Sequence, residues 1–187
     1  MGLIDRLFGR KKAAANPSHG GDEMVSLVVL SQSAPELTLD SVRSALDAVF
    51  PGQFLPPREE DNFVIDGPVP GATYMIQCTV PDASGMFMLR NVPGPYSECS
   101  DFPSRLTGSI RELALGQQCW MSVDAVLTHG TDEDAYRFIG RVLAQFAPPD
   151  SAVLLHPSRM VATAFNDTVR RQLSAGEQPF GVAQGDD

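Results

Sequence analysis

Residues 119–128 have the sequence CWMSVDAVLT, which is the clearest strand signal in the chain. The apolar residues on one face of this strand are Cys119, Met121, Val123, Ala125 and Leu127. Successive side chains of a strand point to opposite faces, so Trp120 and Asp124 share the other face. One interpretation is that Trp120 is an aromatic anchor on a binding surface. We favour a core position instead, beneath a helix that covers this face.

The two-residue period of strands and the helical period, applied to the rest of the chain, predict one domain over residues 24–176. The predicted strands are 24–30, 62–66, 74–80, 86–92, 119–128 and 151–155, and the predicted helices are 39–50, 104–115, 131–146 and 159–175. The strands 74–80 and 86–92 follow one another in the chain and are expected to form an antiparallel hairpin. The order β-α-β-β-β-α-β-α-β-α favours an α+β fold. We expect a mixed, largely antiparallel sheet of about six strands, with helices packed mainly on one face.

Length and composition narrow the class of protein. The chain has 187 residues, which suits one domain with a sizeable core. It has no apolar run near the roughly 20 residues that span a bilayer, and its start lacks the features of a secretory signal. Its three cysteines, Cys78, Cys99 and Cys119, are widely spaced and odd in number, which indicates reduced thiols in the cytoplasm. We predict no cofactor and no metal, with a site formed by all three thiols as the alternative.

Charge is distributed unevenly along the chain. The formal net charge is -9, yet residues 1–12 carry a local balance of +3, so the remainder carries -12. An acidic domain repels nucleic-acid phosphates, which argues against a nucleic-acid partner. Residues 13–23 (AAANPSHGGDE) are predicted to be a flexible linker, and residues 177–187 a loose tail.

Residues 1–12 (MGLIDRLFGRKK) are predicted to form a short basic amphipathic helix. Its apolar face consists of Leu3, Ile4, Leu7 and Phe8, and its cations are Arg6, Arg10, Lys11 and Lys12. Such a helix could bind an anionic membrane surface weakly, which would place the protein in the cytoplasm, peripheral at the inner membrane. The alternatives are docking on a protein partner, docking on its own domain, and a frayed tail.

The sequence contains none of the strong catalytic motifs, such as a phosphate-binding loop or a nucleophile elbow. Two weak candidates for a site remain. Asp124 and His129 lie near the acidic triplet 132–134, and a histidine near carboxylates can act as a base. His156 follows a predicted strand and precedes Pro157. The triplet also has a structural explanation, because carboxylates stabilise a helix N-terminus. Asp124 and His129 are an odd number of residues apart, so their side chains point to opposite faces if the strand runs on unbroken.

The order of elements resembles a bacterial α+β family known only as a domain of unknown function. The resemblance rests on the helix 39–50, the Pro-Gly-Pro loop after 88–95, the strand from Trp120 to His129 with its acidic-capped helix, and the strand from Ala152 to His156. It covers residues 24–175 and implies the fold but no activity. The family strand is richer in histidine, whereas this strand keeps only His129.

Three hypotheses for function follow. The first is a non-enzymatic protein-interaction or adaptor module, held at a membrane or partner by residues 1–12. The second is an enzyme with an unfamiliar site near Asp124, His129 and His156. The third is an immunity-like or chaperone-like protein that masks a basic partner.

Overall fold

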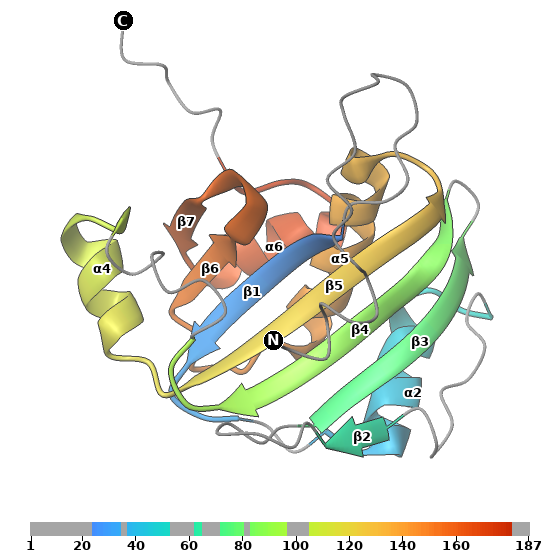
Figure 1. Ribbon diagram of the computed structural model, residues 1–187, viewed down its shortest axis with the longest axis horizontal. Coiled ribbons are helices and arrows are strands. Elements are labelled where there is room, and N and C mark those ends of the chain that lie inside the picture. Colours follow the sequence, from blue (N-terminus) through green and yellow to red (C-terminus); the bar gives the residue numbers. More distant parts are fainter. Residues whose placement is uncertain are drawn as a thin grey trace, which may run out of the picture.

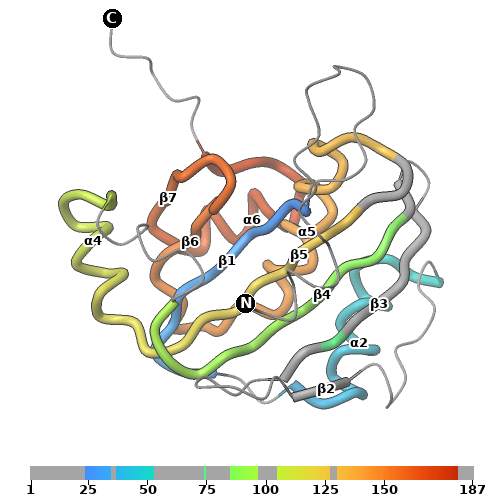
Figure 2. Tube along the Cα trace, in the orientation of Figure 1, coloured from blue at the N-terminus to red at the C-terminus, as the bar shows by residue number. Residues whose placement is uncertain are grey.

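The computed structural model describes residues 24–34, 37–52, 62–64, 72–80, 83–96 and 105–180 (Figure 1). For 62–64, 72–73, 75–80, 83–84 and 127–129 it describes the backbone alone, and these residues are grey in Figure 2. Residues 1–23 and 181–187 lie outside the described part. The predictions of a basic helix and a linker therefore concern residues about which the structure says nothing, and so does the predicted loose tail beyond residue 180. Residues 177–180 of that tail are described, and they are attached to the domain: Gln178 accepts a hydrogen bond from Arg159 at 3.1 Å, and Phe180 packs against the core.

The described residues form an α+β fold around one antiparallel sheet. Its strands are β1 (Val25–Ser31), β2 (Asn62–Val64), β3 (Ala72–Val80), β4 (Ala83–Pro93), β5 (Cys119–His129), β6 (Val153–His156) and β7 (Val161–Ala164). They lie in the order β2-β3-β4-β5-β1-β6-β7, and every neighbouring pair is antiparallel. The predicted hairpin is confirmed, because β3 pairs with β4 from Ala72–Asn91 to Val80–Ala83.

Helices cover the two faces of the sheet unequally. The helices are α2 (Leu39–Val49), α4 (Gly108–Leu115), α5 (Asp132–Phe146) and α6 (Asp167–Ala175). Figure 1 shows α2, α5 and α6 behind the sheet and α4 beside the β6–β7 end. The core behind the sheet includes Val123 of β5, Ile139 of α5 and Leu173 of α6. A second, smaller core on the other face includes Trp120, Val28 and Leu155, with Ile110 of α4 packed against it. Trp120 is buried, as we favoured.

Two features of the predicted fold were wrong, the mixed sheet and the helix over residues 159–175. The sheet is antiparallel throughout the described residues, and it has seven strands there, close to the predicted number of about six. The predicted helix 159–175 is instead a 3-10 turn (Pro157–Arg159), strand β7 and the shorter helix α6. The break follows from Met160, which has a left-handed backbone (φ 54°) that no helix continues. The chain then turns back, and β7 pairs with β6 from His156–Val161 to Val153–Ala164.

Candidate functional site

Asp124 lies in a buried polar cluster on the face of the sheet away from α5. The side chains of Arg90 and Asp124 are 2% and 1% exposed, and Arg90 Nη2 lies 3.0 Å from Asp124 Oδ2. Arg90 Nε and the Ser122 hydroxyl also donate to Oδ2, at 3.0 and 2.9 Å, and the Ser26 hydroxyl donates to Oδ1. The register explains the cluster, since Ser26 pairs with Asp124 across β1 and β5, and Arg90 pairs with Ser122 across β4 and β5.

The hydrogen bonds of this cluster give Asp124 a structural role. A buried carboxylate needs a cationic partner and donors to both oxygens, and Asp124 has them. The Arg90 guanidinium also lies 5.0 Å from the centre of the Trp120 ring, within cation–π range. The cluster therefore links three adjacent strands beneath the surface. Arg90 was not predicted as part of a site, because an arginine on a strand is usually exposed and only the pairing of β4 with β5 shows its buried partner.

His156 lies on the opposite face of the sheet, against α5. Its side chain is buried, and its ring centre lies 4.2 Å from that of Tyr136 and 5.4 Å from that of Phe180. Nδ1 accepts a hydrogen bond from the backbone N–H of Arg159, 3.3 Å away, so Nδ1 carries no proton. Burial, with a smaller contribution from the Arg159 cation, lowers the pKa of His156 to about 4. His156 is neutral at pH 7 and caps the 3-10 turn.

The structure does not bring the three candidate catalytic residues together. Asp124 faces the α4 side of the sheet, whereas His156 contacts Tyr136 on the α5 side. His129 ends β5, where its backbone pairs with Ser84. Strand β1 separates β5 from β6, so these two strands are about 10 Å apart. The side chain of His129 lies outside the described residues.

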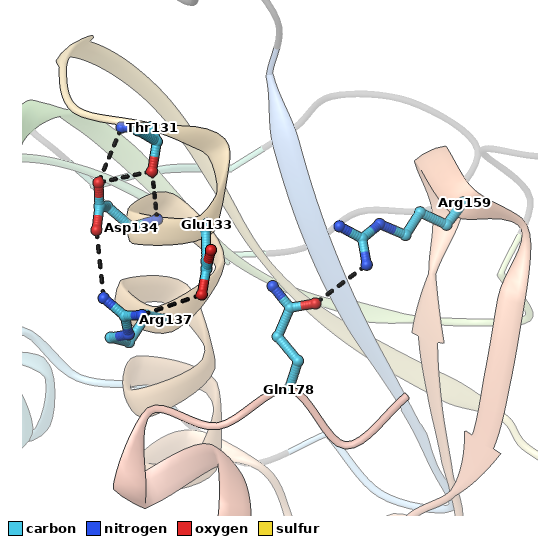
Figure 3. Close-up of polar contacts among 6 residues, drawn as sticks. All are labelled: Thr131, Glu133, Asp134, Arg137, Arg159 and Gln178. Atoms are coloured by element: carbon cyan, nitrogen blue, oxygen red, sulfur yellow. Dashed lines mark hydrogen bonds and ion pairs between the residues drawn. The ribbon is translucent and has the colours of Figure 1, made fainter. Parts of the chain in front are cut away.

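The acidic triplet after β5 forms the first turn of α5 (Figure 3). The Thr131 hydroxyl accepts from the Asp134 N–H at 3.2 Å, and Asp134 Oδ2 accepts from the Thr131 N–H at 3.0 Å, which completes a capping box. Hydrogen bonds from the Thr131 side chain and backbone lower the pKa of Asp134. Arg137 contacts Glu133 and Asp134 at 3.2 and 3.3 Å. These contacts support the structural explanation of the triplet.

We expect Thr131→Ala to lower the free energy of unfolding by about 1 kcal/mol, because it removes the hydroxyl that caps α5. Urea denaturation followed by circular dichroism measures this change. Thr131→Ser keeps the hydroxyl and is the matched control, expected to stay near the wild-type value. An equal loss in both variants would show that the cap is not the cause.

The surface around α4 is the other notable feature of the described residues. No residue of α4 itself is buried, and Leu113 and Leu115 are 40% and 64% exposed. A small apolar hollow lies between this helix and the sheet. Its lining includes Leu30, Tyr96, Leu106, Leu115, Cys119 and Leu155. We call α4 together with this hollow the α4 surface. The sequence predicted only a helix at 104–115 and gave no sign that its leucines are exposed.

The acidic character of the chain is not a property of the described fold. The described residues contain nine arginines and ten aspartates or glutamates, so their charges nearly cancel. Most of the net charge of -9 therefore belongs to segments outside the described part. No group of three His, Cys, Asp or Glu side chains within the described ranges is arranged to hold a metal ion. Among those same ranges, no helix has the length and apolar character needed to cross a bilayer.

The described residues define an α+β fold with a seven-stranded antiparallel sheet and a weakly packed helix, α4. Comparison with known proteins adds no further identification, since no family model, curated protein or solved structure matches the chain. The resemblance to a bacterial domain family thus stays a prediction.

Proposed function

We propose that this protein is a non-enzymatic interaction module that binds another protein through its α4 surface. The observation that carries the proposal is the exposure of Leu113 and Leu115 beside an apolar hollow. Large exposed side chains that rim a hollow are typical of binding sites, because a partner gains by removing their area from water. Leu115 is the more important of the two, since it is 64% exposed and also lines the hollow.

The weak packing of α4 supports the same function. This helix spans only eight residues, and its packed side is limited to the partly buried Ile110 and Ala114. A helix this short gains little stability from its own backbone hydrogen bonds. A bound partner would cover its exposed leucines and complete the packing that the domain leaves open.

The titratable candidates point in the same direction. Asp124 is engaged by Arg90, Ser122 and Ser26, and His156 caps a turn beneath Tyr136. Structural use of both groups favours the interaction module over the enzyme hypothesis. The tether remains a proposal that rests on the sequence of residues 1–12, which would hold the module near an anionic surface or a partner.

The experiment is proximity labelling in the source cells with the full chain and with Leu115→Asp. We expect the substitution to remove proteins that wild type labels, because a carboxylate at the rim of an apolar hollow disfavours burial there. Stability should change by less than about 0.5 kcal/mol, since the Leu115 side chain is mostly exposed.

Gln145→Asp is the matched control, because it adds the same charge at an exposed position of α5. It should retain the full set of labelled proteins. Deletion of residues 1–12 separates the two parts of the proposal, since it should remove only contacts that depend on the tether. A Leu115→Asp profile identical to wild type would refute the α4 surface as the binding site.

A further inference from the structure

We infer that the partner of the α4 surface is an acidic amphipathic peptide segment, whose apolar side chain enters the hollow and whose carboxylates meet Arg105 and Arg111. The inference rests on the proposed function and adds the chemistry of the partner. Two independent features of the surface carry it: the apolar lining of the hollow and the exposed cations at its rim.

The hollow selects an apolar side chain. Leu30 of β1, Leu155 of β6, Leu106 before α4 and Leu115 at its end surround it. Tyr96 also lines the hollow, with its ring packed edge-on at 5.3 Å from Trp120. A leucine or phenylalanine from a partner fits such a lining, whereas a charged side chain would lose its hydration there.

The cations beside the hollow select the charge of the partner. Arg111 precedes Ala114 and Leu115 by three and four residues, so it lies one turn away on the same side of α4 as these two lining residues. Arg105 is adjacent in sequence to the lining residue Leu106. Both arginines are exposed, and neither forms an ion pair with any described residue.

The one carboxylate on α4 does not cancel this charge at the hollow. Glu112 is exposed, and the helical period places it on the side of α4 opposite Ile110 and Ala114, which pack against the core. Glu112 also precedes Leu115 by three residues, so it lies near that edge of the hollow. Among the described residues beside the hollow, two cations, Arg105 and Arg111, stand against this one anion. Carboxylates on a partner would be attracted to the rim and would steer its approach.

The same charge disfavours two other occupants. Residues 1–12 of this chain have the required apolar side chains, but their local charge of +3 has the same sign as the rim. A second copy of the chain, related by a two-fold axis through this surface, would bring Arg105 and Arg111 toward their own equivalents. An acidic segment from another protein avoids both repulsions.

The test uses the full chain and two synthetic helical peptides of about four turns. Both peptides have Leu and Phe on one face; one has Glu on the other face and the second has Lys. Fluorescence anisotropy at low salt measures binding. We expect the Glu peptide to bind at least about tenfold more tightly than the Lys peptide, and Arg111→Glu to reverse or abolish that preference.

A second measurement locates the bound peptide. Cys119 lines the hollow and is partly exposed, so the Glu peptide should slow its alkylation by iodoacetamide, measured by peptide mapping. Leu115→Asp should weaken binding, and Gln145→Asp should leave both binding and Cys119 protection unchanged. Equal binding of the two peptides, or no binding of the Glu peptide, would overturn the inference.

Other results separate this inference from the proposed function. If a peptide of residues 1–12 protects Cys119 and the Glu peptide does not, the partner chemistry is wrong while the docking surface stands. A dimer in sedimentation velocity that Leu115→Asp dissociates would likewise overturn the partner chemistry and assign the surface to a second copy. If Leu115→Asp alters neither peptide binding, oligomeric state nor proximity labelling, both the inference and the proposed function fail.

Discussion

Asp124→Asn is expected to lower the free energy of unfolding by about 3–5 kcal/mol, a large fraction of the stability of a domain this size. The substitution preserves shape but removes the negative charge that both Nε and Nη2 of Arg90 contact at 3.0 Å. The guanidinium then stays in an interior site without that carboxylate. Chemical denaturation at pH 7 measures the change.

Two comparisons isolate the burial of the pair as the cause. Glu133→Gln breaks the exposed ion pair with Arg137 and should cost less than about 1 kcal/mol, because solvent screens that pair. Combining Asp124→Asn with Arg90→Met should cost less than the sum of the two single changes. If Asp124→Asn costs no more than Glu133→Gln, the cluster does not stabilise the sheet as argued.

Lowering the pH from about 7.5 to about 5 is expected to reduce stability by about 2 kcal/mol through His156 alone. The unfolded chain protonates this histidine near its ordinary pKa of 6.5, whereas the folded protein does so only near a pKa of about 4. Between those values the unfolded state binds more protons. The stability from neutral His156 is therefore complete above pH 6.5 and is lost as the pH falls toward 4.

His156→Asn tests this expectation, because the asparagine oxygen can replace Nδ1 as acceptor for the Arg159 N–H but does not titrate. The variant should be less stable than wild type at pH 7.5, since it loses the packing of the ring against Tyr136 and Phe180. As the pH falls, the variant should be spared the loss of stability that protonation of His156 causes in wild type. Urea denaturation at a series of pH values gives both curves. Parallel curves for the two proteins would contradict the assignment.

The alternation of apolar and polar residues in strands and the capping residues of helices made much of the fold predictable. The strand at 119–128, the hairpin of β3 and β4, and the helix that begins after Thr131 follow from signals within a few residues of each other. The helix predicted at 159–175 shows where such signals fail. Val161, Phe165 and Val169 have helical spacing, but Val161–Ala164 forms a strand, because pairing with β6 outweighs the local preference.

The candidate site was predictable only in part. The sequence pointed to Asp124 and His156, but it could not show that each is engaged on a different face of the sheet. It gave no reason to single out Arg90 or Leu115, because the role of each depends on what lies across from it. An arginine on a strand is ordinary until a carboxylate on the next strand pairs with it, and a leucine on a helix is ordinary until the helix leaves it exposed.

By itself the sequence determined the periodicity and ends of most elements, since these depend on contacts between residues close together in the chain. The tertiary structure alone decided the order of the strands, the burial of Arg90 with Asp124, and the exposure of Leu113 and Leu115 beside the hollow. Each of these depends on residues far apart in sequence, so no local pattern specifies it. The α4 surface exists because three helices occupy one face of the sheet and leave α4 to pack on the other.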